Sequence, residues 1–165
     1  MPVPESRTVD VTGEPALSSH GVCAADVMSA PVHVVGPQET MWDAWSVMLH
    51  SGQRHVVVCD AHRCAGVLDD RILFAHWPTG PFGVRSTPVR DLMRSRTTCV
   101  LPETTLARIA MVMVTEGVDA VPVTDADGMV LGIVTGSDIA AAVARYDLGG
   151  TRPEGPADLA GSTTV

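Results

Sequence analysis

The sequence predicts an α/β (α+β) protein built from two β-α-β-β-α repeats, packed sheet to sheet with pseudo-two-fold symmetry. Two segments of the chain align with a shift of 65 residues, Asp26 aligning with Asp91. Each segment holds apolar residues at helical spacing, followed by two short strand-like runs joined by a polar turn. A unit of about 55 residues buries little core by itself, so the two copies are expected to share one.

The internal repeat decides the architecture. The residues that recur 65 positions later are Asp26, Met28, Val35, Pro37, Thr40, Val47, Met48, Gly52, Val56, Val58, Asp60 and Ala61, and after one skipped residue Gly66 aligns with Gly132. We expect a pseudo-two-fold module with clefts where the two sheets meet.

Each repeat has the same predicted order: a short leading helix, an extended piece, a longer helix, a hairpin and a closing helix. In the first repeat these are 24–28, 32–35, 41–49, 55–59 with 64–68, and 70–75; in the second they are 89–93, 97–101, 106–114, 120–124 with 129–135, and 138–146. Threonines (Thr40, and Thr104 or Thr105) begin the longer helices, and Gly52 and Gly117 end them.

The apolar faces of the two longer helices supply the predicted core. They consist of Met41, Ala44, Trp45, Met48 and Leu49 in the first repeat and Leu106, Ile109, Ala110, Met113 and Val114 in the second. Trp42 falls off this face and is expected to be partly exposed, as a candidate dimer contact.

The chain divides into five predicted segments. Residues 1–20 and 147–165 are expected to be flexible tails, because they mix Pro, Gly, Ser, Thr and charged residues without a period. Between them, residues 21–77 form repeat 1, residues 78–87 form a Pro- and Gly-rich linker, and residues 88–146 form repeat 2.

The composition excludes several classes of function. The net charge is −8, which disfavours a nucleic-acid surface. No apolar run reaches the length of a membrane span, and residues 1–20 lack the pattern of a secretory signal. From these two observations we expect a cytoplasmic protein. In a reducing cytosol the four cysteines, which form no C-x-x-C pair, are expected to be buried thiols. The absence of Lys and Asn suggests a GC-rich bacterial genome.

The segment 132–138, Gly-Ile-Val-Thr-Gly-Ser-Asp, carries the clearest chemical pattern. A buried strand is predicted to end at Thr135, and a helix is predicted to begin at Ser137 or Asp138. Free backbone N–H groups, hydroxyls and one carboxylate then meet at one point, which suits a ligand with a phosphate and a sugar. The alternative is that Ser137 or Asp138 only caps the helix.

These repeats resemble tandem cystathionine-β-synthase (CBS) domains, also called a Bateman module, here expected to be of the stand-alone bacterial type. The marks are Asp-Val-Met at 26–28, Asp-Leu-Met at 91–93, Gly-Val-Asp-Ala-Val-Pro-Val at 117–123 and the 132–138 segment. The resemblance covers about residues 22–146. It implies a cleft that binds an adenosine-containing ligand such as AMP, ADP, ATP, S-adenosylmethionine or NAD.

The resemblance also implies roles for individual residues. Asp138 would hold the ribose hydroxyls, and Thr135 and Ser137 would meet the phosphate. Adenine would pack against Val118, Ala120 and the neighbourhood of Thr98. A carboxylate can accept hydrogen bonds from both ribose hydroxyls, which agrees with the chemistry of the segment itself.

The first repeat departs from this pattern. It has Asp69 where the hydroxyl is expected and Ile72 where the ribose carboxylate is expected, so its cleft is predicted to be empty or to bind something other than a nucleotide. A register slip would make Asp70 the ribose partner, and this alternative stays open.

The resemblance places a basic residue before the second strand, facing the phosphates. In the first repeat that residue is Arg54, followed by His55. Arg54 and Asp138 are therefore predicted to converge on one sugar-phosphate from opposite repeats. The alternative for Arg54 is a solvated arginine at a strand end.

No catalytic or metal-binding pattern emerges from the spacing. Cys59, His62 and Cys64 lack a fourth ligand for zinc, and no Ser-His-Asp or Cys-His arrangement can be argued. We therefore expect neither enzymatic activity nor a metal or other cofactor.

The predicted function is a regulatory module that binds an adenine nucleotide or S-adenosylmethionine and signals to an unknown protein partner. Ligand would favour one packing of the repeats and so change the outer surface or the dimer surface. A homodimer is expected, and neither nucleic acid nor membrane is an expected partner. The alternatives are a ligand-free dimeric scaffold and an enzyme that acts on a nucleotide.

Overall fold

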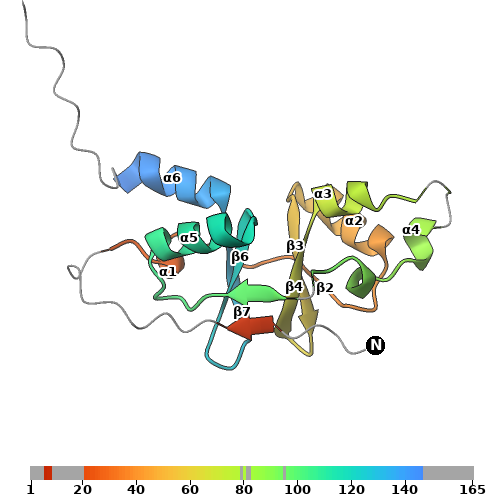
Figure 1. Cartoon of the computed structure of the whole chain (residues 1–165), viewed down its shortest axis with the longest axis horizontal. Helices are drawn as coiled ribbons and strands as arrows, with labels where there is room; N and C mark the ends of the chain where they lie inside the picture. Colours follow the sequence, from red (N-terminus) through yellow and green to blue (C-terminus); the bar gives the residue numbers. More distant parts are fainter. Residues whose placement is uncertain (1–5, 9–20, 79, 81–82, 95, 147–165) are drawn as a thin grey trace, which may run out of the picture.

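The computed structural model describes residues 6–8, 21–78, 80, 83–94 and 96–146. Within them, the two repeats form two α/β halves that lie side by side with their strands at the centre (Figure 1). The predicted mixed α/β fold of two similar halves is confirmed. No helix among the described residues is long and apolar enough to cross a membrane.

Repeat 1 follows the predicted order of elements. It begins with α1 (Ala24–Val27) and β2 (Val34–Val35), continues through α2 (Met41–Ser51) and the hairpin of β3 (His55–Asp60) and β4 (Arg63–Asp69), and ends with α3 (Asp70–Ala75). The Thr40 side chain accepts from the N–H of Asp43 and caps α2, and Gly52 ends the helix in the left-handed conformation, at φ 69°.

Repeat 2 copies this order. Its elements are η1 (Val89–Asp91), β5 (Thr97–Cys99), α5 (Leu106–Glu116), the hairpin of β6 (Ala120–Thr124) and β7 (Val130–Thr135), and α6 (Gly136–Tyr146). The leading element is a 3-10 helix where the sequence predicted a longer one. Gly117 ends α5 as Gly52 ends α2, at φ 61°.

The strand pairing repeats with the sequence. In the first half β2 pairs parallel with β3, with Val35 opposite Val58. In the second half the equivalent residues, Val100 and Val123, form a parallel bridge. Each β3–β4 or β6–β7 hairpin is antiparallel and has an irregular register near its turn. The 65-residue shift therefore relates backbone pairs as well as residue types.

The leading segment of each repeat packs on the other repeat. The N–H of Ala24 donates to the carbonyl of Thr104 at 2.8 Å, and the N–H of Val89 donates to the carbonyl of Glu39 at 2.8 Å. Figure 1 shows α1 beside α5 and α6, far along the molecule from α2. Both bonds join equivalent positions, so the exchange of leading segments is itself pseudo-symmetric.

Three buried clusters form the core. The first fills repeat 1 and includes Val89 and Leu92 from the leading segment of repeat 2. The second fills repeat 2 and includes Ala24 from the leading segment of repeat 1. The third lies between the two hairpins, where Val57 and Cys64 meet residues of the other half. The predicted shared core is therefore present, and the exchanged segments extend it.

Two short elements occupy segments predicted to be irregular. β1 (Ser6–Thr8) lies in the predicted N-terminal tail and pairs parallel with β5, so that prediction was wrong for these three residues. Main-chain pairing to a free strand edge leaves no apolar pattern in the sequence. α4 (Gly83–Ser86) lies in the predicted linker and buries Val84. The other residues of the predicted tails lie outside the described residues.

Candidate functional site

The exchange of leading segments creates two clefts between the repeats. Cleft A combines the β4–α3 junction of repeat 1, at Asp69 and Ile72, with the start of β5 and the segment 116–120 of repeat 2. Cleft B combines the segment 29–33 and the start of β3 from repeat 1 with Ile133 of β7. Including the space at their openings, the volume of cleft A is about 490 Å³ and that of cleft B is about 330 Å³.

The two clefts are the same cavity built twice with different side chains. Residues that line cleft B have their equivalents, 65 or 66 positions away in the sequence, in the lining of cleft A. The pairs, with the cleft B residue first, are Ser29 and Arg94, Val32 and Thr97, His33 and Thr98, Gln53 and Val118, and Ile133 and Val67. His55 lines both clefts and therefore forms part of the wall between them.

The β7–α6 junction adjoins cleft B. The N–H and the hydroxyl of Thr135 both donate to Asp138 Oδ2 at 2.7 Å, and the N–H of Asp138 donates to Thr135 Oγ1 at 3.4 Å. Thr135 therefore caps α6 and Asp138 completes a capping box from the first turn, whereas the alternative stated above had Ser137 or Asp138 as the cap. The second oxygen, Oδ1, lies 3.5 Å from the hydroxyl of Ser29, a residue of the cleft wall. One carboxylate oxygen is thus held by Thr135, and the other accepts a long hydrogen bond from Ser29 at the edge of cleft B.

The eight predicted site residues do not meet in one cleft. Thr98, Val118 and Ala120 line cleft A together with His55, whereas Thr135 and Asp138 adjoin cleft B. Ser137 is exposed in the first turn of α6. The sequence prediction had placed the residues expected to contact adenine (Thr98, Val118 and Ala120) in the same cleft as the Asp138 carboxylate, because all of them belong to repeat 2. In the fold, Ser29 of repeat 1 pairs its backbone with Ile133, so β7 faces the leading segment of repeat 1.

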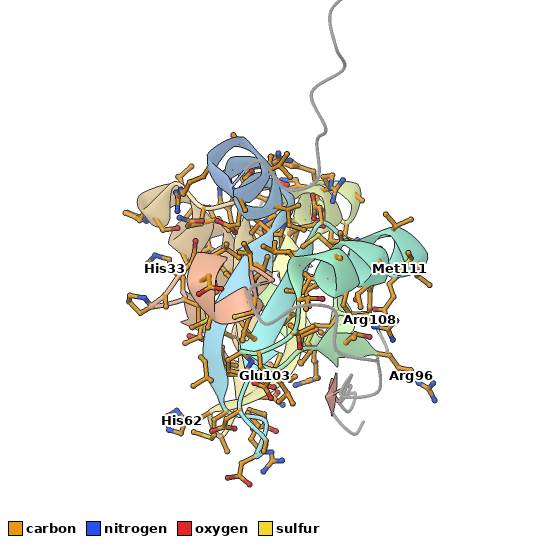
Figure 2. The ribbon with its side chains drawn as sticks, turned by 90° about the vertical axis from the view of Figure 1, so that its left-hand side faces the viewer. His33, His62, Arg96, Glu103, Arg108 and Met111 are labelled. Carbon is orange, nitrogen blue, oxygen red and sulfur yellow. The ribbon has the colours of Figure 1, made fainter. Side chains whose placement is uncertain are left out.

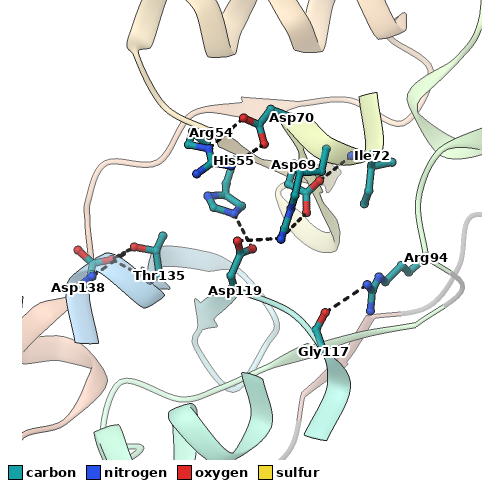
Figure 3. Close-up of polar contacts among 11 residues, drawn as sticks. Arg54, His55, Asp69, Asp70, Ile72, Arg94, Gly117, Asp119, Thr135 and Asp138 are labelled. Carbon is teal, nitrogen blue, oxygen red and sulfur yellow. Dashed lines mark hydrogen bonds and ion pairs between the residues drawn. The ribbon is translucent and has the colours of Figure 1, made fainter. Parts of the chain in front are cut away.

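Arg54 lines neither of the two clefts in the described part of the chain. Its side chain is 64% exposed, and its guanidinium donates to both oxygens of Asp70, at 2.9 Å from Nε and 3.3 Å from Nη2 (Figure 3). This pairing raises the pKa of Arg54 and lowers the pKa of the Asp70 carboxyl. The predicted convergence of Arg54 with Asp138 is therefore absent, and Asp70, the alternative ribose partner, is occupied by Arg54.

A polar network crosses from repeat 1 to repeat 2 in cleft A. His55 Nε2 lies 2.9 Å from Asp119 Oδ1 (Figure 3), and Arg71 Nη2 forms an ion pair with Asp119 Oδ2 at 2.8 Å. Burial by itself would raise the pKa of Asp119, but the hydrogen bond to His55 and the nearby charges of His55 and Arg71 outweigh it, so the pKa lies below its usual range.

Asp69 completes this network. Its Oδ1 accepts from the N–H of Ile72 at 2.7 Å and caps α3, as Thr135 caps α6. Its Oδ2 accepts from Arg71 at 3.3 Å. Sequence reasoning missed Arg71 and Asp119. One signal was present: Asp119 aligns with Arg54, so equivalent positions carry opposite charges.

Comparison with known proteins identifies the family. The profile of the CBS domain family matches residues 24–77 and 89–145, which together span more than half of the chain. The chain belongs to the CBS domain family. It carries two CBS repeats, as the sequence resemblance suggested. A search of curated proteins found no match.

Solved CBS structures share this fold. A protein assigned to acetoin utilization (AcuB) from Vibrio cholerae is 27% identical, with a TM-score of 0.66 over 78% of this chain and 96% of its own. CBSX2, solved in complex with AMP, is 26% identical, with a TM-score of 0.66 over 77% of this chain and 99% of its own. The CBS domain pair of MJ0100, solved with 5′-methylthioadenosine and S-adenosyl-L-methionine, is 16% identical, with a TM-score of 0.69 over 77% and 99%.

Proposed function

We propose that this CBS pair is a regulatory module that binds an adenosine-containing ligand in cleft B. The observation that carries the proposal is the Asp138 carboxylate at the start of α6. Its Oδ2 is held by Thr135, and its Oδ1 faces the cleft wall beside Ser29. A fixed carboxylate whose second oxygen accepts one long hydrogen bond, at 3.5 Å, can exchange that bond for the shorter ones that ribose hydroxyls donate. The AMP complex of CBSX2, at 26% identity, supports the ligand class.

The residues that line cleft B limit which adenosine-containing ligands it can bind. The apolar surface that could contact a purine consists of Pro31, Val32, Val57 and Ile133. The peptide bond between Ala30 and Pro31 is cis. The titratable side chains that line it are His33 and His55, with no arginine among the described residues. A triphosphate needs several positive partners. We therefore propose AMP or S-adenosylmethionine as the ligand rather than ATP.

Thermal and isothermal titration of the full chain with AMP, S-adenosylmethionine and ATP tests the proposal. A ligand present at 100 times its Kd should stabilise the fold by about 2.7 kcal/mol. AMP or S-adenosylmethionine should bind at least about tenfold more tightly than ATP. Asp138→Asn should weaken binding about tenfold or more, because a hydrogen bond to a charged group contributes about 1.5–3 kcal/mol.

Asp43→Asn is the matched control. The N–H and hydroxyl of Thr40 donate to Asp43 Oδ2 at 2.9 and 2.7 Å, the same arrangement as at α6, but this cap lies outside both clefts. Its substitution should leave ligand affinity unchanged. Loss of binding in both variants would show a general effect of capping. No stabilisation by any ligand would favour the scaffold alternative, and turnover of the ligand would favour an enzyme.

We further propose that ligand binding signals through the outer helices to a protein partner, without catalysis. A ligand that contacts both repeats favours one packing of them over others. The helices of both halves lie on the side of the molecule away from the hairpin turns (Figure 1). The proposed compartment is the cytoplasm, and four free cysteines agree with a reducing environment.

A homodimer through this helical surface is part of the proposal. Leu49 on α2 and Val114 on α5 occupy equivalent positions and are 65% and 80% exposed. Met111 projects outward from α5 (Figure 2), and Val143 on α6 is half exposed. Exposed apolar side chains on helices of both halves indicate a contact surface, and a second copy presents the same apolar residues.

Sedimentation of the full chain tests the dimer. The unmodified chain should sediment as a dimer at micromolar concentration. Val114→Asp should shift it to the monomer, because a buried unpaired carboxylate is costly at an apolar contact. Glu103→Gln, an exposed change in the loop before α5, should leave the dimer intact. A monomeric unmodified chain would contradict this part of the proposal.

A further inference from the structure

Three side chains that can bind a metal ion converge on the wall of cleft A. One ligand atom from each of His55, Asp69 and Asp119 lies within 4.8 Å of the others. They come from the start of β3, the end of β4 and the residue before β6, so both repeats contribute. The His55 and Asp69 side chains are only 14% and 17% exposed, which limits competition from water.

A positive charge already lies between the two carboxylates. Arg71 Nη2 is 2.8 Å from Asp119 Oδ2 and 3.3 Å from Asp69 Oδ2. The Arg71 side chain is 59% exposed, so it can turn into solvent without disturbing the core. Exposed ion pairs contribute little to stability. The guanidinium therefore marks a place where this fold holds a cation that can be exchanged.

We propose that cleft A binds a divalent transition-metal ion, with zinc as the best match, through His55 Nε2, Asp69 Oδ2 and an oxygen of Asp119. The metal takes the place of the Arg71 guanidinium. An imidazole nitrogen with carboxylate oxygens suits zinc, whereas magnesium prefers oxygen ligands alone. Three protein ligands leave one position of a tetrahedral ion for water or a bound molecule. This proposal does not depend on the ligand of cleft B.

The geometry requires only a small adjustment. Zinc binds nitrogen and oxygen at about 2.0–2.2 Å, so tetrahedral ligands lie about 3.4 Å apart. His55 Nε2 and Asp119 Oδ1 are already 2.9 Å apart. All three ligand atoms lie within 4.8 Å of one another, so the remaining approach is about 1.4 Å or less. The capping bond of Asp69 to Ile72 uses Oδ1, which leaves Oδ2 for the metal.

The other cations around cleft A lie apart from these three side chains. Arg94 donates to the carbonyls of Glu116 and Gly117, at 3.0 and 3.4 Å, and Figure 3 shows it away from His55. Arg96 extends outward at the edge of the molecule (Figure 2). Arg54 is held by Asp70. Arg71 is therefore the cation whose exchange the proposal requires.

Isothermal titration of the chelator-treated full chain with zinc chloride tests the proposal. One zinc ion per chain should bind. Asp119→Asn should weaken binding at least about tenfold, since even residues that only orient a ligand cost 10–100-fold. Arg71→Ala should tighten binding about two- to fivefold, because it removes a competing exposed ion pair. Asp70→Asn, a neighbouring carboxylate outside the cluster, should change affinity less than about twofold.

The opposite signs of these effects separate a metal site from a structural network. A purely structural role for the cluster predicts no tightening in Arg71→Ala. The Arg71 side chain is exposed, so Arg71→Ala should fold. Its zinc affinity then distinguishes a metal site from a structural network even if Asp119→Asn does not fold. Absence of zinc binding in both the unmodified chain and Arg71→Ala would overturn the proposal. Zinc binding that Asp119→Asn leaves unchanged, or equal binding of magnesium, would overturn it as well.

Discussion

Ile109→Ala should lower the free energy of unfolding by about 2–5 kcal/mol, the range for truncating a buried aliphatic side chain. Ile109 is fully buried on α5 and packs in the cluster with Val100, Val121 and Val134. The same cluster contains Ala24, which repeat 1 contributes. The cavity therefore weakens both repeat 2 and its hold on repeat 1. Urea unfolding followed by circular dichroism measures the change.

The shape of that unfolding curve carries further information. Because each core contains residues of the other repeat, the variant should still unfold in one transition with an unchanged dependence on urea. Two separate transitions would contradict the exchange of leading segments. Arg108→Ala is the control on the same helix. Its side chain is exposed (Figure 2), so the free energy should change by less than about 0.5 kcal/mol.

Gly132→Ala should be the next most damaging substitution, costing about 1–3 kcal/mol through overpacking. A methyl group at Gly132 would lie 2.5 Å from Sδ and 2.9 Å from Cγ of Met28. Met28 belongs to the leading segment of repeat 1, so this glycine of β7 lets the exchanged segment pack directly against the strand. The clash involves the middle of the methionine side chain, which cannot move without shifting α1. Urea unfolding gives the cost.

Gly66→Ala is the matched control at the equivalent position of β4. There the added methyl would meet chiefly Cε of Met93, the free end of a flexible side chain, with Thr97 Oγ1 at 3.4 Å. That end can rotate away, so the change should stay within about 1 kcal/mol of zero. Equal costs at the two glycines would contradict the asymmetry that the structure shows between the repeats.

The local fold was predictable because the signals are local. Helical spacing, capping threonines and terminal glycines placed α2 and α5, and Met41, Ala44, Met48, Leu106, Ile109 and Met113 are buried as expected. The last apolar position of each helix was wrong: Leu49 and Val114 are exposed. An apolar pattern identifies a face, and it does not say whether that face meets the chain's own core or another molecule.

The candidate site was less predictable because it depends on long-range pairing. The motif at Thr135 and Asp138 was identified from the sequence. A helix cap was one of its two interpretations, but it was assigned to Ser137 or Asp138, and Thr135 is the residue that caps α6. Which repeat faces it was not encoded locally. That follows from backbone pairing between Ser29 and Ile133, more than a hundred residues apart. The opposite charges of Arg54 and Asp119 at aligned positions likewise gain meaning only when Arg71 and His55 are placed beside them.

The exchanged leading segments limit how this molecule can respond to anything it binds. Drawing the halves apart like a hinge would extract Ala24 from one core and Val89 from the other, and both are fully buried. Such opening would approach unfolding in cost. Motions that keep both leading segments in place are small translations and rotations along the interface between the repeats. Binding in either cleft would then change the outer surface through a shift of about 1 Å between helices, without a large change in the shape of the molecule.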